Sequence, residues 1–173
     1  WQLSTDKVIT VWVALTQSDK KAGALEVVPK SSKLGIIKNL DVEDAREAYV
    51  NGLKTTNEND MLSYRQDLKE FLIKNKPEVI SLKSGQYSIH HVNTVHGSGI
   101  NQTENYRIGF AIRYISSDTQ HYKLKNDYAL HVSGKKNSYF IDEKRPKINF
   151  GENEISDYEL SMQSGGAFGN KKY

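Results

Sequence analysis

Apolar and polar residues alternate in several short stretches of this chain, a pattern typical of β-strands. Residues 8–15, with the sequence VITVWVAL, are mostly β-branched or aromatic, which predicts a strand. Shorter strands are expected at 24–29, where Pro29 ends the pairing, and at 78–82 and 87–92. The last clear strand is expected at 107–115, and weaker candidates lie at 129–132 and 139–141.

Two stretches between these strands carry helical signals. Asp41 can cap a helix that ends near Asn51, before Gly52. A second helix is expected up to Asn75, because apolar residues recur there at helical spacing: Met61, Leu62, Tyr64, Leu68, Phe71 and Leu72. Segment 41–75 therefore interrupts the strands, and we expect it to cover a pocket.

Strands with irregular connections and helical inserts favour an antiparallel β-sandwich or jelly roll. A doubly wound α/β fold fits poorly, because helices do not alternate regularly with strands and no glycine-rich phosphate loop is present. From residue 151 onward the composition becomes polar. We therefore expect one domain over residues 1–150 and a polar, flexible tail over 151–173.

Composition narrows the functional classes. The 173 residues contain no cysteine, which excludes disulfides, thiolate metal ligands and cysteine nucleophiles from this sequence. The net charge of +3 arises from 24 basic and 21 acidic residues, too balanced to favour nucleic acid. No apolar run approaches the roughly 18 residues of a membrane span. We expect a cytoplasmic protein whose partner is a small molecule.

The strand expected at 107–115 has two contrasting faces. One face combines two cations with two very small residues, Arg107, Gly109, Ala111 and Arg113. The other face is apolar and is expected to pack in the core, with Ile108, Phe110, Ile112 and Tyr114. A planar guanidinium can bind a carboxylate through two parallel hydrogen bonds. The first face therefore predicts a pocket for an anionic ligand.

His96 stands just before Gly97-Ser98-Gly99, where the backbone can turn sharply. Imidazole is a good ligand for divalent iron, copper or zinc, so His96 is a candidate metal ligand. Taken alone, it could equally be a structural histidine, and Arg107 could pair with Glu104 at the surface. The other four histidines are interpreted as structural or surface residues: His90, His91, His121 and His131. His90 and His91 are adjacent, so they point to opposite sides of a strand.

Several segments together resemble the phytanoyl-CoA dioxygenase family. They are residues 8–15, residues 23–29, the turn at 83–86 before His90 and His91, residues 96–101 and residues 107–114. The resemblance covers most of residues 1–116 and implies an iron(II)- and 2-oxoglutarate-dependent oxygenase on a double-stranded β-helix, a mainly β, cupin-like jelly roll with helical inserts. It also implies that the protein hydroxylates a small organic substrate.

The resemblance assigns roles to individual residues. His96 would be the distal iron ligand, and Arg107 would hold the far carboxylate of 2-oxoglutarate with help from Ser98. Trp12 matches a tryptophan that lines the co-substrate pocket, and Thr10 shares its face of the strand. We place Thr10 and Arg113, which shares the face of Arg107, on the substrate side.

Two features depart from the family pattern. The other two iron ligands of the family form a His-x-Asp motif, which would fall just before Trp1, and Asp6 cannot replace it because no histidine stands two positions earlier. We therefore expect the chain as given to be catalytically incomplete. Residues 29–33 read PKSSK where the family usually has PGSHK, so the geometry of that loop is open to question.

Two other functions remain open at this stage. The chain could be a jelly roll that lost iron and only binds a carboxylate or a sugar. It could also be a halogenase, in which a small residue replaces the ligand aspartate. The residues preceding Trp1 would separate these alternatives from the oxygenase. The sequence leaves the substrate and the oligomeric state undefined.

Overall fold

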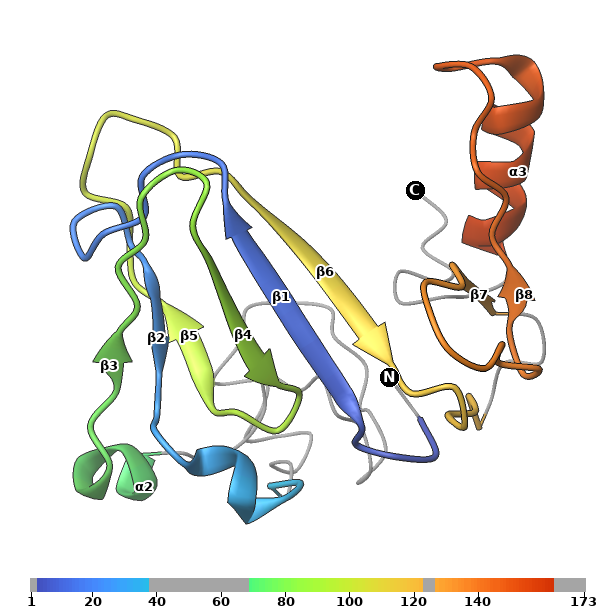
Figure 1. The fold of residues 1–173 in the computed structure, drawn as a ribbon. Coiled ribbons are helices and arrows are strands. Elements are labelled where there is room, and N and C mark those ends of the chain that lie inside the picture. Colours follow the sequence, from blue (N-terminus) through green and yellow to red (C-terminus); the bar gives the residue numbers. More distant parts are fainter. Residues whose placement is uncertain (1–2, 38–68, 123–126, 164–173) are drawn as a thin grey trace. The chain divides into compact units, whose positions relative to one another are not determined.

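The computed structural model describes residues 3–37, 69–122 and 127–163 (Figure 1). Strands predominate over helices, so the predicted mainly β fold class is confirmed. The chain forms two compact units, which we call the strand unit, residues 6–114, and the C-terminal unit, residues 1–5 and 115–173. Each is considered by itself below.

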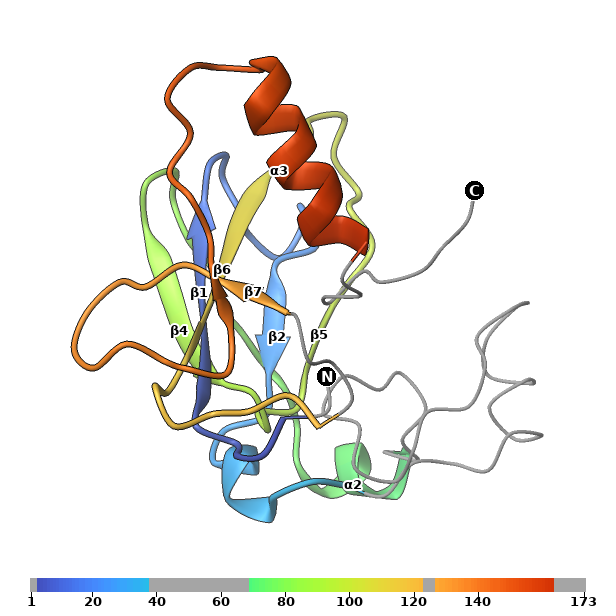
Figure 2. The same ribbon diagram turned by 90° about the vertical axis from the view of Figure 1, so that its right-hand side faces the viewer.

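The strand unit is built from two three-stranded sheets (Figures 1 and 2). One sheet has the order β4-β1-β6, with β1 at Val8–Ala14, β4 at Tyr87–His91 and β6 at Gly109–Ile115. The other has the order β3-β2-β5, with β2 at Leu25–Val27, β3 at Glu78–Val79 and β5 at His96–Ser98. Strands that are distant in sequence are thus neighbours in space, as expected for a jelly roll.

The register of β1 against β4 defines the inner face of the first sheet. Thr10 lies opposite His90 and Trp12 lies opposite Ser88 in this antiparallel pair. Val8 and Ala14, on the same side of β1 as Thr10 and Trp12, are fully buried. The core is completed by small and branched residues around β2, namely Ala22, Ala24, Leu25 and Val28.

The apolar face of β6 is more open than predicted. We expected it to be a core face, yet Ile108 and Phe110 are 48% and 57% exposed. Alternation places them on the side of the strand opposite Arg107 and Gly109, which belong to the inner face. The prediction of a core face was therefore wrong for these two residues, while on the other face Arg107 is partly buried and Arg113 is exposed.

A turn at residues 19–23 holds the start of the β5–β6 loop against β2. Gly23 is buried with φ +70°, and a Cβ atom there would collide with the carbonyl oxygen of Gly99. The backbone amide of Ala22 donates to Asp19 Oδ1 at 3.0 Å, and this hydrogen bond is the main reason that the pKa of Asp19 is lowered. Gln102 N donates to the carbonyl of Lys21 at 2.8 Å, which fixes the loop that follows β5.

The helices of the strand unit are short. A 3-10 turn, η1, spans Ser31–Leu34 and α2 spans Lys69–Lys74. The helix expected from Asp41 and most of the one expected up to Asn75 lie outside the described residues. Among the helices that are described, none has the length and apolarity needed to cross a membrane.

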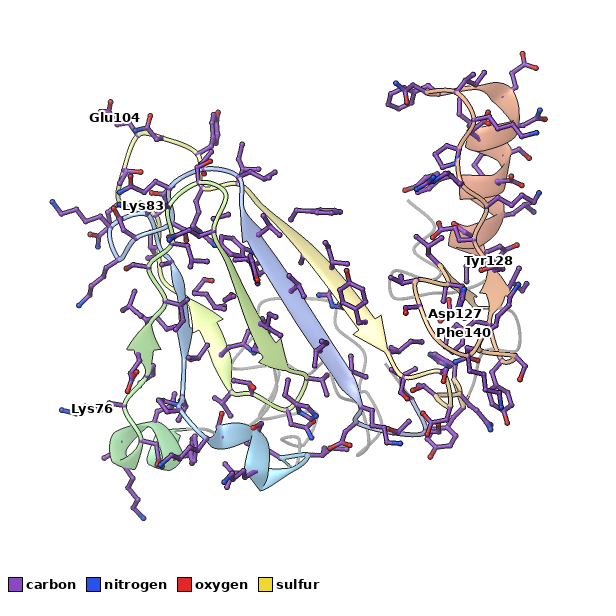
Figure 3. All side chains as sticks on the ribbon, viewed as in Figure 1. Lys76, Lys83, Glu104, Asp127, Tyr128 and Phe140 are labelled. Atoms are coloured by element: carbon purple, nitrogen blue, oxygen red, sulfur yellow. The ribbon has the colours of Figure 1, made fainter. Side chains whose placement is uncertain are left out.

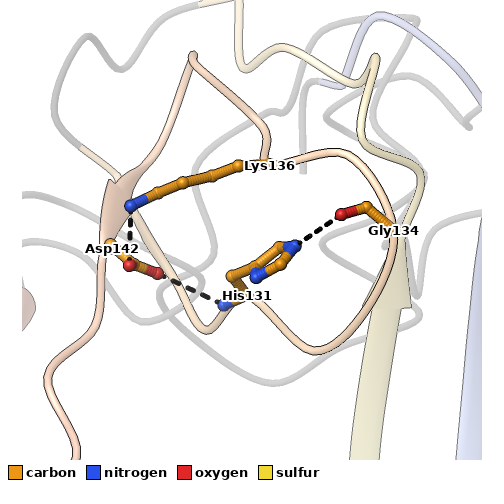
Figure 4. A network of polar contacts seen from close by, with 4 residues as sticks. All are labelled: His131, Gly134, Lys136 and Asp142. Atoms are coloured by element: carbon orange, nitrogen blue, oxygen red, sulfur yellow. Dashed lines mark hydrogen bonds and ion pairs between the residues drawn. The ribbon is translucent and has the colours of Figure 1, made fainter.

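The C-terminal unit contains a small parallel sheet, β7 at Tyr128–Ala129 with β8 at Ile141–Asp142. Asp142 anchors the connection between them (Figure 4): its carboxylate accepts from Lys136 Nζ at 2.8 Å and from the amide of His131 at 3.3 Å. The hydrogen bond from Lys136 is the main cause of the lowered pKa of Asp142. Nε2 of His131 bonds to the carbonyl of Gly134 at 3.0 Å, so this imidazole belongs to the loop network.

Helix α3, at Glu152–Gln163, lies within the stretch that we expected to be a flexible tail. Glu152 and Glu154 occupy its first turn, where negative charge is favourable for a helix. Its apolar residues stay exposed, for example Tyr158 at 62%. The helix therefore lacks the buried apolar stripe that would have identified it in the sequence.

Candidate functional site

His96 opens β5, where it pairs with Val27 of β2. Its Nδ1 lies 2.7 Å from the carbonyl oxygen of Thr94. Because a carbonyl oxygen can only accept, Nδ1 carries the proton and the lone pair of the neutral ring is on Nε2. This is the arrangement usual for a metal-bound histidine, whose second nitrogen donates to a carbonyl or carboxylate. The residue therefore fits the predicted role of metal ligand.

The backbone before His96 is held in place by a buried serine hydroxyl. Ser31, which is only 2% exposed, donates to the carbonyl of Val28 at 2.7 Å and accepts from the amide of Val95 at 2.8 Å. Val28 N also donates to the carbonyl of Val95 at 2.9 Å. These bonds tie the residue preceding His96 to the end of β2, so the imidazole enters the site from a rigid support.

The loop in which the sequence departs from the family keeps a glycine-like backbone. Lys30, at the position where the family usually has glycine, has φ 64° and ψ 3° in the left-handed region. A residue with a Cβ atom adopts this region at some energetic cost. Lys30 thus adopts a backbone conformation that glycine would adopt more easily, and Ser31 next to it contacts Val95.

Arg107 lies two residues before β6, and its guanidinium lies over the ring of Trp12. The Cζ atom is 5.6 Å from the ring centroid, within the range of a cation–π contact. Thr16 fixes the backbone on both sides of the arginine: its hydroxyl donates to the carbonyl of Tyr106 at 3.0 Å and accepts from Ile108 N at 2.8 Å. The arginine is therefore positioned from both β1 and β6.

The alternative pairing of Arg107 with Glu104 is absent from the described structure. Glu104 lies on the loop between β5 and β6 (Figure 3), and no ion pair joins it to Arg107. Arg107 is partly buried while Glu104 is exposed. The guanidinium thus faces the indole of Trp12 and remains able to bind an anion from the inner face.

Gly109 makes room for the indole. A Cβ atom at this position would overlap Cζ2 and Cε2 of Trp12 and lie 2.7 Å from its Nε1. Trp12 and Gly109 therefore face one another across β1 and β6. Absence of a side chain here lets the tryptophan lie flat against β6, beneath the guanidinium of Arg107.

We predict that Gly109→Ala displaces the indole of Trp12. The new methyl group must push aside a ring that is held between two strands, so the unfolding free energy should fall by about 1–3 kcal/mol. The measurement is chemical denaturation in a Trp1→Phe background, in which fluorescence reports Trp12 alone. A shifted emission maximum of the folded state should accompany the loss of stability.

Gly97→Ala is the matched control for this prediction. A Cβ atom at Gly97 meets nothing within 4 Å, so its stability should change by no more than about 1 kcal/mol. Equal effects of the two substitutions would show that the overlap with Trp12 does not determine the packing at Gly109.

The remaining predicted site residues belong to strands of the same unit, where Thr10 is partly buried and Ser98 and Arg113 are exposed. Ser98 is two residues beyond His96 in β5, on the same side of the strand. Thr10 lies opposite His90 on β1, and Arg113 is close enough for its charge to lower the pKa of His90. No hydrogen bond or ion pair joins His96 to Arg107, although both belong to the strand unit.

His90 lies beside His96, a contact that the sequence did not predict. We interpreted it as structural or surface, but its ring lies 4.8 Å from that of His96, centroid to centroid, with the planes tilted by 50°. Burial, followed by the charges of His96 and Arg113, lowers the pKa of His90 to about 4, so the ring is neutral at neutral pH. The alternation of Tyr87 and Ile89 with Ser88 and His90 was a signal that His90 shares the polar, inward face.

The described residues include no group of three or more histidines, cysteines, aspartates and glutamates able to hold a metal ion together. Within those ranges the candidate site therefore consists of imidazoles and guanidinium groups. It offers neutral nitrogen ligands to a metal and positive charge to an anion.

Comparison with known proteins places these features in context. The family model described as phytanoyl-CoA dioxygenase (PhyH) matches residues 1–109. A comparison with curated proteins gives no significant match.

Two solved structures of a non-heme monooxygenase, ThoJ, are similar in fold. The nickel complex is 25% identical with a TM-score of 0.65, and the match covers 94% of this chain and 52% of that one. The apo form is 24% identical with a TM-score of 0.70, covering 94% and 54%. This chain spans about half the length of the ThoJ chains.

Proposed function

The chain belongs to the phytanoyl-CoA dioxygenase family, and from this premise we propose that it acts in an iron(II)- and 2-oxoglutarate-dependent oxygenase that hydroxylates a small organic molecule. The observation that carries the proposal is the hydrogen bond from His96 Nδ1 to the carbonyl of Thr94, which leaves Nε2 free to bind a metal. Imidazole is a preferred ligand of iron(II), so this residue fits the ion that the family uses.

Arg107 binds the far carboxylate of 2-oxoglutarate in this proposal. Its guanidinium offers two parallel donors, and its contact with Trp12 limits the orientations that it can take. Trp12 forms the wall beneath the co-substrate, and Ser98 adds a hydroxyl from the strand that carries His96. Thr10 and Arg113 face the substrate from β1 and β6.

With iron bound, dioxygen and 2-oxoglutarate would supply the oxidising chemistry: one oxygen atom of O2 would enter a C–H bond of the substrate, and the other would end in the succinate that forms, with carbon dioxide, from 2-oxoglutarate. The residues of this chain contribute position and shielding. Trp12 and the fully buried Val8 and Ala14 form an apolar inner surface on β1, which keeps water away from the bound carboxylate and strengthens its pairing with Arg107.

A second candidate function is a carboxylate-binding module without catalysis. It is favoured by the absence, within the described ranges, of a cluster of three or more potential ligands. Arg107 and Trp12 alone would suffice for such a module. The two functions differ in whether the binding of 2-oxoglutarate depends on a metal.

The test is calorimetric titration of 2-oxoglutarate into the chain without oxygen, with and without iron(II). The oxygenase predicts that iron(II) raises the affinity at least about tenfold, because 2-oxoglutarate can then bind both the metal and Arg107. Appearance of a visible charge-transfer band on mixing would report the same chelate. Affinity that is equal with and without iron(II), and no such band, would reject the oxygenase in favour of the binding module.

A further inference from the structure

Three polar residues form a row across one face of the first sheet, which we call the polar row: His90 of β4, Thr10 of β1 and Arg113 of β6. Thr10 lies directly opposite His90 in the register of β1 and β4. On its other side β1 is flanked by β6, which runs antiparallel to it (Figure 1). Leu15 N donates to the carbonyl of Ile108 at 2.9 Å. Arg113 is as far along the chain from Ile108 as Thr10 is from Leu15, so it lies opposite Thr10.

The strands bring the members of the polar row within reach of one ligand. Opposite residues of neighbouring strands have Cβ atoms about 5 Å apart, and Thr10 stands between the other two residues. Burial, then the charge of His96, then that of Arg113 lower the pKa of His90 to about 4, so Arg113 is near enough to act on this ring. Thr10 and His90 are partly buried and Arg113 is exposed, so the row is sheltered at one end and accessible at the other.

The polar row offers several hydrogen-bond donors and a single positive charge. Nδ1 of His90 is buried without a hydrogen-bond partner, which is unfavourable until a ligand atom bonds to it. The hydroxyl of Thr10 can donate, and the guanidinium of Arg113 presents parallel N–H groups. Because the buried imidazole is neutral, only Arg113 is charged. A carboxylate, with one negative charge, matches the row better than a phosphate group with nearly two.

The polar row is separate from the site that we assign to 2-oxoglutarate. Arg107 and Trp12 form that site, and Trp12 follows Thr10 on the same face of β1. Successive side chains on one face of a strand are about 7 Å apart, so an anion in the row would lie beside the co-substrate. The row also borders the predicted metal ligand, because the rings of His90 and His96 are 4.8 Å apart. A molecule held there would lie next to the metal site.

We propose that the polar row binds a carboxylate group of the substrate, so that the substrate is a carboxylic acid. This inference rests on the proposed function, to which it adds the chemical class of the substrate. A carboxylate has about four acceptor positions, enough for two bonds from Arg113 and one each from Thr10 and His90. In this role His90 donates a hydrogen bond to the substrate and does not bind the metal.

The test uses butanoate as the probe and butanamide, its uncharged analogue, as the control ligand. Both are titrated into the 173-residue chain with Arg107→Ala, which removes the cation of the 2-oxoglutarate site; Arg107→Gln is the second background if the alanine variant does not fold. Nuclear magnetic resonance of the histidine rings reports binding at His90, whose signal is identified by its absence from His90→Gln. Butanoate should shift this signal saturably and bind at least about tenfold more tightly than butanamide.

Variants of the polar row test the individual contacts. Arg113→Gln should weaken butanoate binding about tenfold or more, and Arg113→Lys should weaken it less, because it keeps the charge but not the two parallel donors. Thr10→Val removes the hydroxyl at similar size and should weaken binding severalfold. Arg145→Gln, at an exposed arginine of the C-terminal unit, is the matched control and should bind normally. Circular dichroism establishes that each variant is folded.

Two results would overturn the proposal. One is butanamide binding as tightly as butanoate, which would show that the site recognises the alkyl chain instead of the carboxylate. The other is an unchanged butanoate affinity in folded Arg113→Gln, which would place the bound anion elsewhere.

Failure of this proposal can be distinguished from failure of the proposed function, which is tested by the effect of iron(II) on 2-oxoglutarate binding. If iron(II) raises that affinity but butanoate does not shift the His90 signal, the oxygenase stands and a carboxylic acid substrate is rejected. If butanoate binds as expected but iron(II) has no effect, the polar row is an anion site of a binding module, and its assignment to an oxygenase substrate is wrong.

Discussion

Replacing His96 with alanine should lower the affinity for iron(II) by at least about 100-fold, the largest effect that we expect on metal binding from any single substitution. The ring is oriented by the bond from Nδ1 to Thr94 and by the Ser31 contacts that hold Val95. Alanine keeps that backbone but provides no nitrogen atom, so the iron(II) affinity falls because a metal ligand is lost. The measurement is the iron content after anaerobic dialysis against a range of iron(II) concentrations.

The appropriate control changes the support of His96 while keeping its imidazole. Ser31→Ala removes the hydroxyl that bridges Val28 and Val95, and it leaves two polar backbone groups without that partner. It should weaken iron(II) binding less than His96→Ala and should lower the stability of the fold by about 1–3 kcal/mol. Iron content equal to wild type in His96→Ala would remove this residue from the metal site.

The longest strands were accessible from sequence because their signal is local. Residues 8–15 are mostly β-branched or aromatic, and residues 107–115 alternate apolar residues with small or cationic ones; β1 and β6 follow these stretches closely. Strand β5 was not predicted. Its three residues, His-Gly-Ser, have no strand propensity of their own, and they are extended because β2 supplies their backbone partners.

The site divides in the same way into local and non-local parts. Alternation grouped Arg107 with Gly109, since period two fixes which residues share a face, and both contact Trp12 in the structure. The contact of His90 with His96 depends on how two separate sheets meet, and no periodicity within one strand encodes that distance. The exposure of Phe110 could not be predicted for the same reason. Alternation shows which residues share a face of the strand, but it does not show whether another element covers that face.

The two units also differ in how strongly sequence specifies them. The two longest strands of the strand unit draw on apolar runs, whereas β7 and β8 are two residues each and α3 leaves its apolar residues Ile155, Tyr158 and Leu160 exposed. The network around Asp142 depends on single side chains, Lys136 and His131, placed by a loop. Short elements of this kind are stabilised by tertiary contacts, which the local pattern of apolar and polar residues does not predict.

Replacing Arg107 with alanine should weaken 2-oxoglutarate binding about 100-fold while leaving the strand unit folded. Two charge-assisted hydrogen bonds to the far carboxylate are lost, and water enters the space above Trp12. Arg107→Lys should recover only part of the affinity, because an ammonium keeps the charge but cannot offer two coplanar donors. Arg145→Ala, an exposed arginine in the C-terminal unit, serves as the control for charge alone and should bind normally.

The measurement for Arg107 compares 2-oxoglutarate with pyruvate, which has the same 2-oxoacid group but no far carboxylate. If Arg107 recognises that carboxylate, the alanine variant should lose affinity for 2-oxoglutarate and change little for pyruvate, since only the former contains the group that the guanidinium binds. A uniform loss for both acids would instead indicate a general electrostatic effect, and unchanged 2-oxoglutarate affinity would exclude Arg107 from the co-substrate site. The difference in affinity between the two acids therefore distinguishes a specific contact of Arg107 with the far carboxylate from a general attraction by positive charge, to which Arg113 would also contribute.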